Sequence, residues 1–348
     1  MAQRRITLKD IAASLGVSAN TVSRALAGRS DISVATQERV RKEASRLGYV
    51  PNSIARSLVS GASGTMGIVI TNPSNPLYAQ LIAGAAEAAR AASKTLLLFV
   101  SSEDAETERE GIESLLASSV DAVIAVPVQI QPEPWQRVTD LGVPLVLVNR
   151  DIPELGVDFV GVDHFGSMRF MVEHVVQQGA QSVWVVEEDL AVPSVESRIA
   201  GFEQGVVDAG IEMNSGKKIR IPTRRVHSLA QPWQAEESYA MGMEIFAEET
   251  PPDALICGND FFALGLIKAL QEHGYRVPED VLVTGVGDHP YSNFVSPAIT
   301  SVRLPGFKLG SEAMRLALSR LSNADQARQR HIIDTEHMIR TSSVHRSD

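Results

Sequence analysis

Residues 6–28 read ITLKDIAASLGVSANTVSRALAG, and this stretch decides the fold of the N-terminal part of the chain. Thr7 lies three residues before Asp10, the spacing of a capping box that satisfies free N–H groups at a helix start. The apolar residues of this first helix share one face at i, i+3, i+4 and i+7, namely Leu8, Ile11, Ala12 and Leu15. Gly16 is placed to end the helix, and Ser18 to begin a second one. The pattern predicts a helix-turn-helix unit, whose second helix is suited to the major groove of DNA.

The charge distribution favours the same interpretation. Residues 1–60 contain ten Lys or Arg and four Asp or Glu, a net charge of +6. The whole chain carries −10, so residues 61–348 carry −16. A basic segment on an acidic body is typical of a protein that meets phosphate only through that segment. Taken alone, the basic residues are better explained as solvated helix faces, but together with the helix-turn-helix pattern they favour binding to DNA.

Length and composition limit the remaining possibilities. A chain of 348 residues exceeds what one hydrophobic core usually serves, so we expect two or three domains. The single cysteine, Cys257, excludes a disulfide framework and suits a reducing compartment. No apolar run follows the basic N-terminus, and no stretch approaches 18 uninterrupted apolar residues. We therefore expect a soluble, cytoplasmic protein with no membrane segment.

Beyond residue 65 the pattern changes to short apolar runs that alternate with helical periods. The runs are residues 66–70, 95–101, 121–127, 144–150, 158–163, 182–188, 219–221, 253–260 and 281–287. The helical periods are residues 77–92, 106–118, 164–179, 195–209, 233–248, 261–273 and 306–321. This alternation predicts doubly wound α/β structure with buried parallel strands. Nine strands are many for one sheet, so we expect two lobes with a ligand cleft between them, at the carboxyl ends of the strands.

These observations predict the following organisation. The fold class is a small all-α helix-turn-helix domain followed by an α/β core of two doubly wound lobes. The expected segments are a DNA-binding domain at 1–50, a linker at 51–64, and a ligand-binding core at 65–348. Within the core, we expect a first lobe from about 65–163 and 293–321, and a second lobe from about 164–290 and the C-terminal tail.

The chain resembles the LacI/GalR family of bacterial transcription regulators over nearly its whole length. The motifs TLKDIAASLGVSANTVSRAL, LGYVPNSIARSL, PLVLVNR, SRIAGFEQ, CGNDFFALGLIKAL and VPEDVLVTGVGD occur in the order and spacing of that family. The resemblance implies a homodimer, formed by the core at 65–348, that binds a pseudo-palindromic operator in double-stranded DNA, and a hinge within the linker at 51–64. It also implies a periplasmic-binding-protein-like core that binds a small, carbohydrate-derived effector, and a repressor that this ligand releases.

The resemblance also implies which residues contact DNA. Ala19, Asn20 and Arg24 match positions that reach base edges, and Asn and Arg suit adenine and guanine. The positions expected to hold phosphates or to position the helix are Thr7, Ser18, Thr21, Ser23 and Arg29. In the hinge, the matching residues are Asn52, Ala55, Arg56 and Leu58. Leu58 corresponds to a side chain that is inserted between base steps in the minor groove.

The effector site implied by the resemblance draws on both lobes. Its expected residues are Tyr78, Asn149, Arg150, Arg198, Trp233, Asn259 and Asp288. Trp233 is explained about equally well as a core aromatic, and an arginine at a domain edge, such as Arg150, is usually part of a surface ion pair. Family members often carry an acid where this chain has Gly287, and Asp288 is one residue further on. Without that acid, Arg150 and Arg198 make the expected cleft more positive. This favours an anionic effector, such as a sugar acid or sugar phosphate.

Other functional classes have little support. The sequence lacks HExxH, P-loop, GxSxG, CxxC and dinucleotide-binding glycine motifs. Its eight histidines lack metal-ligand spacing, so we expect no enzyme activity, no metal and no cofactor. A solute-binding protein of a transport system would share the two-lobed core. It would need a signal peptide, however, and would have no use for residues 1–58.

Overall fold

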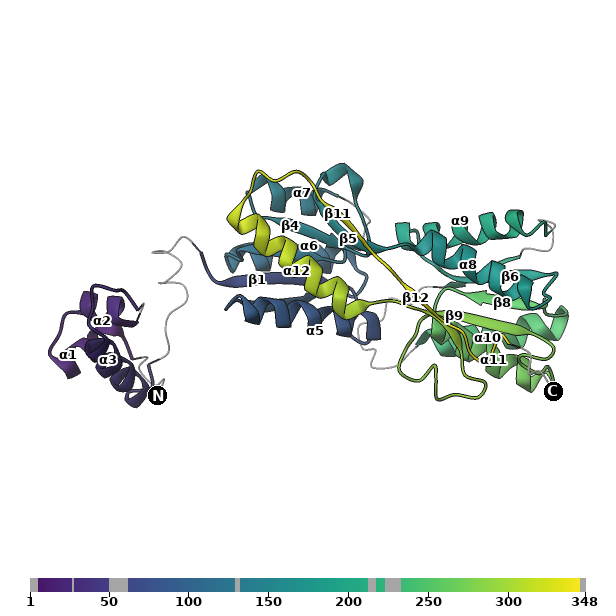
Figure 1. Ribbon diagram of the computed structural model, residues 1–348, viewed down its shortest axis with the longest axis horizontal. Coiled ribbons are helices and arrows are strands. Elements are labelled where there is room, and N and C mark those ends of the chain that lie inside the picture. The colour runs from purple at the N-terminus through teal and green to yellow at the C-terminus, as the bar shows by residue number, and fades with distance from the viewer. Residues whose placement is uncertain are drawn as a thin grey trace. The chain divides into compact units, whose positions relative to one another are not determined.

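A computed structural model describes residues 6–26, 28–49, 62–128, 132–211, 217–222 and 233–344. The chain forms two compact units, Met1–Ser63 and Gly64–Asp348 (Figure 1). The first is helical, and the second consists of α/β structure in two lobes. Each unit is described by itself below.

The first unit is a three-helix domain built around a small apolar core. Its helices are α1 (Leu8–Leu15), α2 (Ala19–Leu26) and α3 (Val34–Arg46). The expected capping box is confirmed: Thr7 N donates to Asp10 Oδ2 at 2.8 Å, and Asp10 N donates to Thr7 Oγ1 at 3.4 Å. Gly16 ends α1 with a φ of 68°, a left-handed conformation that favours glycine. Ile11, Val22 and Val40, all 0 % exposed, join the three helices into one core.

The first lobe of the second unit is a six-stranded parallel sheet in the order β11-β5-β4-β3-β1-β2. Its strands are β1 (Thr65–Ile70), β2 (Thr95–Val100), β3 (Ala122–Ala125), β4 (Leu145–Val148), β5 (Asp158–Val162) and β11 (Arg330–Ile333). Helices α5 (Pro76–Ala91) and α12 (Gly306–Ser322) pack on one face of this sheet, and α6 (Ala105–Ala117) and α7 (Glu133–Asp140) on the other. A short 3-10 turn, η1 (Pro153–Leu155), connects β4 and β5.

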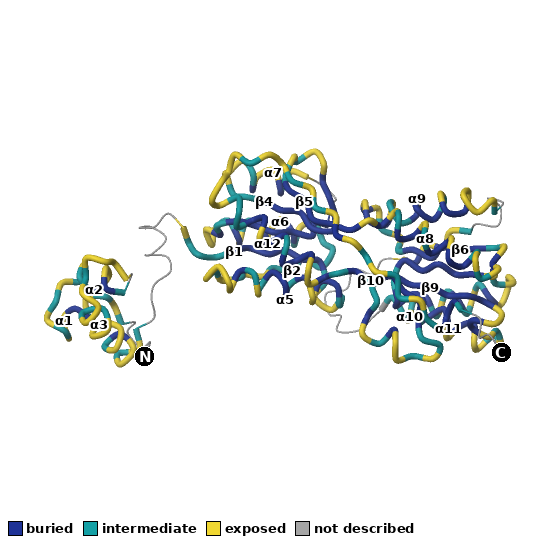
Figure 2. Tube along the Cα trace, viewed as in Figure 1, coloured by how far each residue is buried: buried dark blue, intermediate teal, exposed yellow. Residues whose placement is uncertain are grey.

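The second lobe repeats this architecture with the strand order β12-β10-β9-β8-β6-β7, in which only β12 is antiparallel to its neighbour. Its strands are β6 (Val183–Asp189), β7 (Lys218–Pro222), β8 (Ala254–Cys257), β9 (Leu282–Gly287), β10 (Thr300–Arg303) and β12 (Glu336–Met338). The helices α8 (His164–Gln177) and α9 (Pro193–Asp208) cover one face, and α10 (Trp233–Glu248) and α11 (Asp260–Glu272) the other. In Figure 2 the central strands of both sheets, such as β1, β4 and β9, are buried, whereas β2 at the edge of the first sheet is exposed or half-buried.

Two of the expected lobe boundaries are wrong. Strand β10 pairs with β9 in the second lobe, so the chain returns to the first lobe after residue 303 and not near residue 293. Strand β11 then pairs with β5 in the first lobe, although the whole C-terminal tail was expected in the second. The chain therefore crosses between the lobes after β5, after β10 and after β11. Spacing could not reveal this, because strands of only four residues, such as β10 and β11, carry too little pattern to indicate their partners.

The nine strands expected from apolar runs are all present, and one further helix appears. Helix α7, EPWQRVTD, was not predicted from apolar periodicity because it spans only two turns, too few to show a repeating pattern. It is held in place by Trp135 and Val138, which are 0 % and 1 % exposed and share one helical face. The expected glycine stops also appear: Gly179, Gly210 and Gly274 follow α8, α9 and α11 with positive φ.

Close backbone packing joins α5 to α12 in the first lobe. A Cβ atom on Gly84 would lie 2.0 Å from the carbonyl oxygen of Phe307, and one on Gly310 would lie 1.9 Å from that of Leu81. Both glycines therefore allow the two helices to approach more closely than any other residue would permit. This contact fixes α12 on the sheet face next to β3, β4 and β5.

Candidate functional site

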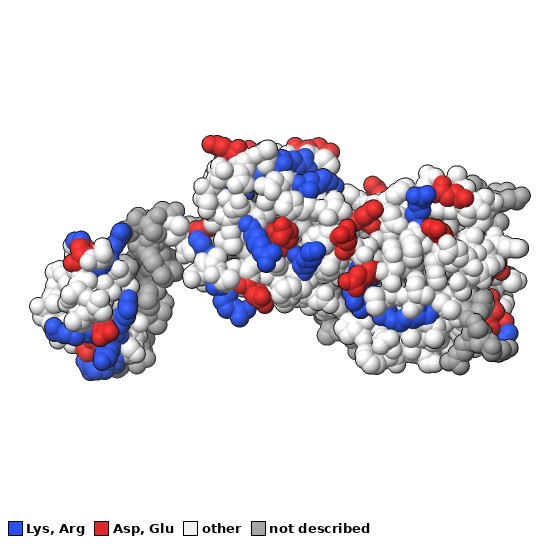
Figure 3. Space-filling view, viewed as in Figure 1, with Lys and Arg blue, Asp and Glu red and all other residues white. Residues whose placement is uncertain are grey.

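Helix α2 presents an exposed polar face that suits contact with another molecule. Asn20, Ser23 and Arg24 are exposed, whereas Val22 and Ala25 on the opposite face are buried. Figure 3 shows basic side chains over much of the visible face of this helical unit. The residues expected to contact bases lie on this helix, and the side chains of Asn20 and Arg24 are exposed.

Three of the expected phosphate contacts also hold the ends of helices. The hydroxyl of Thr7 donates to Asp10 Oδ2 at 2.7 Å as part of the α1 capping box. The Ser18 hydroxyl accepts from the backbone N–H of Thr21 at 3.0 Å and lies 2.8 Å from the Thr21 hydroxyl. All three residues therefore have a structural role at the start of a helix.

Arg24 forms an ion pair with Asp31, and both side chains remain about half exposed. An ion pair at this exposure contributes little to stability, so binding to another partner can replace it. The expected hinge contacts, Asn52, Ala55, Arg56 and Leu58, lie outside the described residues.

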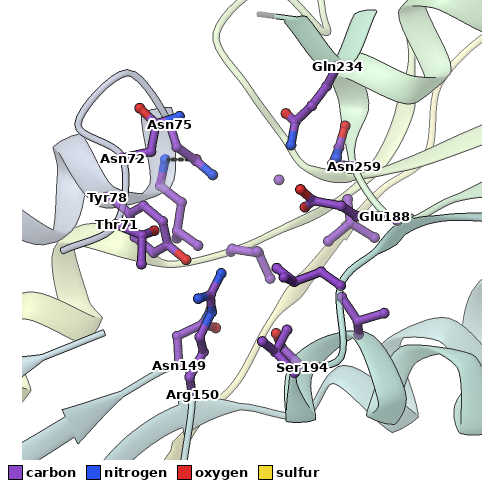
Figure 4. Close-up of a pocket in the computed structure, with 18 of the residues that line it drawn as sticks. Thr71, Asn72, Asn75, Tyr78, Asn149, Arg150, Glu188, Ser194, Gln234 and Asn259 are labelled. Atoms are coloured by element: carbon purple, nitrogen blue, oxygen red, sulfur yellow. Dashed lines mark hydrogen bonds between the residues drawn. The ribbon is translucent and has the colours of Figure 1, made fainter. Parts of the chain in front are cut away.

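A cavity of about 290 Å³ lies between the two lobes. Its walls begin where strands end, as at Thr71 after β1, Asn149 after β4 and Gly258 after β8. This is the place where open α/β folds bind ligands. In Figure 4, Thr71, Tyr78, Asn149 and Arg150 face the cavity from the first lobe, and Glu188, Ser194, Gln234 and Asn259 from the second.

Unusual backbone conformations shape the first-lobe wall. Ser102, Glu103 and Asn149 have φ values of 55°, 56° and 63°, a left-handed region that only a few per cent of non-glycine residues occupy. All three line the cavity. Strained conformations of this kind concentrate at functional sites, where they direct side chains toward a ligand.

Arg150 is buried in the first-lobe wall and already has a carboxylate partner. Its Nη1 and Nη2 donate to Glu103 at 2.8 and 2.6 Å, and Nη1 also donates to the carbonyl oxygen of Pro127 at 3.0 Å. The Nε–H of Arg150 is buried without a hydrogen-bond partner, as is the Thr71 hydroxyl nearby in the same wall. A ligand oxygen can satisfy such groups, whose isolation is otherwise costly. Burial raises the pKa of Tyr78, so this phenol stays protonated and can donate a hydrogen bond.

Arg198 has the same arrangement in the second-lobe wall. It donates from Nε and Nη2 to the carboxylate of Glu187 at 2.5 and 2.9 Å. The Glu187 side chain is fully buried, and that of Arg198 is 12 % exposed. Burial opposes the charge of the guanidinium, but Glu187 outweighs this and raises the pKa of Arg198, so the pair is ionic.

Two amides and a neutral imidazole complete the polar lining. His164 Nε2 lies 3.1 Å from Asn149 Oδ1 across the junction of the lobes. Burial, reinforced by the charge of Arg198, lowers the pKa of His164 to about 3, so the ring is neutral near pH 7. Asn259 caps α11 by accepting from Phe262 N at 2.9 Å, while its side chain faces the cavity in Figure 4.

The structure thus brings together five of the expected effector residues: Tyr78, Asn149, Arg150, Arg198 and Asn259. Asp288 is not among them. Its carboxylate is turned away from the cavity and accepts from Arg303 Nε at 2.7 Å and from Arg340 Nη2 at 2.6 Å. Asp288 instead fixes the end of the second sheet. Trp233 begins α10, but its side chain lies outside the described part of the chain.

Glu103 and Glu187, the carboxylates that pair with the two cleft arginines, were not predicted from the sequence. Glu187 had a usable signal, because it stands in the acidic run EED at the end of a predicted strand, and strand ends form the cleft. Glu103 had none, since its contact with Arg150 joins residues 47 positions apart in the chain.

Comparison with known proteins supports the same organisation. Residues 7–52 match the family model described as bacterial regulatory proteins, lacI family, and residues 172–343 match a periplasmic binding protein-like domain. The chain is 28% identical over 347 residues to the transcriptional regulator CelR of Thermobifida fusca, covering 98% of this chain and 99% of that protein. It is 26% identical over 326 residues to the transcriptional repressor PurR of Haemophilus influenzae, covering 93% and 94%.

Solved structures show the same fold. The lac repressor dimer bound to operator and the anti-inducer ONPF superimposes with a TM-score of 0.85 at 23% identity, covering 98% of this chain and 100% of that one. The complex of CelR with cellobiose gives 0.72 at 25% identity, covering 97% and 100%. Among the described residues, no helix is long and apolar enough to cross a membrane. The chain therefore combines a DNA-binding domain of the lacI family of bacterial regulatory proteins with a two-lobed, periplasmic binding protein-like core.

Proposed function

We propose that the protein is a homodimeric repressor that binds a pseudo-palindromic operator through α2 and the 51–64 hinge. A neutral, hydroxyl-rich metabolite of the sugar class binds in the cleft and releases the DNA. The observation that carries the proposal on the effector is the pairing of both cleft arginines with carboxylates of the protein itself.

The charge of the cleft argues against an anionic effector. Arg150 and Arg198 are each neutralised by a buried or nearly buried carboxylate, that of Glu103 and that of Glu187. With His164 neutral, these two ion pairs and the imidazole carry no net formal charge. A sugar acid or sugar phosphate would have to separate an arginine from its carboxylate and leave that carboxylate buried and unpaired, which is strongly unfavourable. The structure therefore removes the reason for expecting an anion.

The remaining lining suits hydroxyl groups. Amide side chains, which both donate and accept hydrogen bonds, face the cavity from both lobes: Asn72, Asn75, Asn149, Gln234 and Asn259. The unpartnered Thr71 hydroxyl and Arg150 Nε–H offer a further acceptor and donor. This mixture of hydrogen-bond donors and acceptors suits a polyol, whose hydroxyl groups both donate and accept. The relative CelR has been crystallised with cellobiose, a neutral sugar.

An apolar edge strand supports the proposed dimer. Strand β2 ends the first sheet, and Leu97 and Leu98 on it are 37 % and 42 % exposed. An unpaired, apolar edge is prone to associate and is normally covered in the native assembly. A homodimer formed through β2 would cover it and link the two hinge segments. The similar lac repressor has been crystallised as a dimer on its operator.

The proposed switch follows from differential binding. A ligand held by Tyr78 and Arg150 on one lobe and by Arg198 and Asn259 on the other favours one arrangement of the lobes. Because residue 64 leads from the linker directly into β1, a shift of the first lobes across the dimer would change the spacing of the two DNA-binding domains. Half-site spacing is a geometric requirement for operator binding, so the shift would release the DNA.

Thermal unfolding with matched ligands tests the effector class. For each sugar, the panel contains the neutral form, its aldonic acid and its phosphate ester. At about 100 times its dissociation constant, the effector adds roughly 2.7 kcal/mol to the free energy of unfolding. We expect one neutral sugar to raise the melting temperature and Arg198→Gln to abolish this rise, whereas the control Arg137→Gln, on a surface ion pair, retains it. Stabilisation by an acid or phosphate but not by its neutral parent would refute the proposal.

A second assay tests repression. The full-length protein selects operators from random duplexes, and fluorescence anisotropy then follows binding to the selected duplex. The stabilising sugar should weaken binding, and Asn20→Ala should abolish selection. Tighter DNA binding with the sugar would reverse the proposed sign of the switch.

A further inference from the structure

Glu187, Arg198 and Gly258 form one interlocked unit in the second-lobe wall of the cleft. Glu187 lies on β6, Arg198 on α9, and Gly258 directly follows β8, the neighbour of β6 in the sheet. The backbone N–H of Gly258 donates to Val186 O at 2.8 Å, which holds Gly258 beside Glu187. Three separate elements therefore meet at one buried carboxylate.

Gly258 makes room for that carboxylate. A Cβ atom on Gly258 would lie 2.2 Å from Cδ, Oε1 and Oε2 of Glu187. The φ of Gly258 is not in the left-handed region, so backbone conformation does not require a glycine here. The glycine is required by the position of the Glu187 carboxylate, which shows that this position is built into the fold.

The unit determines how much of Arg198 a ligand can reach. Glu187 occupies Nε and Nη2 of the guanidinium, the edge that would otherwise bind a carboxylate or phosphate in a bidentate manner. Nη1 is left for the ligand. An N–H group whose charge is already balanced suits a hydroxyl or carbonyl oxygen, and an approaching anion would meet the Glu187 charge within a few ångströms.

We infer that Glu187 is the residue that sets the charge class of ligand accepted by the cleft: it turns Arg198 from an anion-binding group into a donor for neutral oxygen. This inference rests on the proposed function, because it concerns the same site. It goes further, because it assigns the selection between neutral and anionic ligands to one side chain that does not itself line the cavity. Glu187 is thus a positioning residue that acts through Arg198.

Inorganic phosphate is a suitable probe, because it does not depend on knowing the effector. Apparent phosphate affinity is measured on the full-length protein from the melting temperature at constant ionic strength. We expect no specific binding to the native protein. In Glu187→Gln, loss of the opposing buried charge should tighten phosphate binding on the order of a hundredfold. In Glu187→Gln combined with Arg198→Gln, this gain should disappear.

Matched variants keep the test decisive. Glu203→Gln removes a carboxylate from an exposed pair with Lys218 and should leave phosphate affinity unchanged. If Glu187→Gln does not fold, as judged by near-ultraviolet circular dichroism, Glu187→Ala replaces it and also vacates space for the anion. Folded variants that bind phosphate no better than the native protein would overturn the inference, as would phosphate binding that persists without Arg198. Failure of the proposed function is distinguishable, because it would appear in the native protein as selective stabilisation by a sugar acid or phosphate.

Discussion

Glu108 provides a sharp test of the energetics of the first lobe. This residue of α6 is 3 % exposed. Its carboxylate accepts from Val128 N at 2.7 Å and from Trp135 Nε1 at 3.1 Å, and both partners are uncharged. Burial raises the pKa of Glu108 from 4.5 to about 7; its two hydrogen bonds and Arg150 oppose this shift, and Glu103 adds to it. Glu108 therefore titrates near neutral pH inside the lobe that lines the cleft.

The pH dependence of stability follows from this shift. Because the folded state binds the proton more tightly than the unfolded state, stability is greatest below pH 4.5 and falls as the pH rises through 7. The difference between a pKa of 4.5 in the unfolded state and about 7 in the folded state corresponds to a change of about 3 kcal/mol in the free energy of unfolding. Glu108→Gln is neutral at every pH, but its single acceptor oxygen can serve only one of the two donors, a loss of about 1–2 kcal/mol. Between pH 5 and pH 8.5, the stability of the variant relative to the native protein should therefore rise by about 2–3 kcal/mol.

Urea unfolding at several pH values between 5 and 8.5 measures this difference. Because all other groups titrate alike in the two proteins, their effects cancel in the comparison. Glu106→Gln is the matched control: Glu106 lies on the same helix, is exposed, and pairs with Arg109, so its removal should not change the slope above pH 5. Parallel stability curves for the native protein and Glu108→Gln would show that Glu108 does not titrate in this range.

Four further predictions follow from other parts of the molecule. Gly84→Ala should destabilise the second unit by about 1–3 kcal/mol in urea unfolding, because its Cβ would meet the α12 backbone; an unchanged midpoint would refute the close packing. Leu98→Glu should yield folded monomers in sedimentation analysis, unless β2 is not the dimer edge. Arg24→Ala should cost about 1–3 kcal/mol at one base pair in operator binding, whereas equal losses on all sequences would indicate a phosphate contact. Because the pKa of His164 is depressed to about 3, uptake of its proton by the unfolded state should raise the stability of His164→Gln relative to the native protein by about 1.5 kcal/mol between pH 6.5 and pH 5; parallel stability curves for the two proteins would contradict a buried neutral ring.

The local elements were predictable from the order of residues alone. The capping box of Thr7 and Asp10, the stop at Gly16 and the apolar face of α1 depend on residues within one helix, so their spacing predicts the structure directly. The nine main strands were predictable for a similar reason, because strands buried on both faces must be continuously apolar. Two lobes with a cleft at the strand ends then followed from the number of strands.

Which strands share a sheet depends on how the whole chain folds. Strands β10, β11 and β12 contain three or four residues each, and their partners depend on where the chain crosses between lobes. The pattern placed residues 293–303 and strand β11 in the wrong lobe because such short strands look alike in sequence.

The charge of the cleft was also a tertiary property. Counting residues gave two arginines and suggested an anionic ligand, since the partners of those arginines were not visible in the sequence. Folding brings Glu103 to Arg150 and Glu187 to Arg198, and it directs Asp288 toward Arg303 and Arg340 instead of the ligand. Electrostatic pairing depends on distances of a few ångströms between residues far apart in the chain, and only the order of strands and helices in space sets those distances.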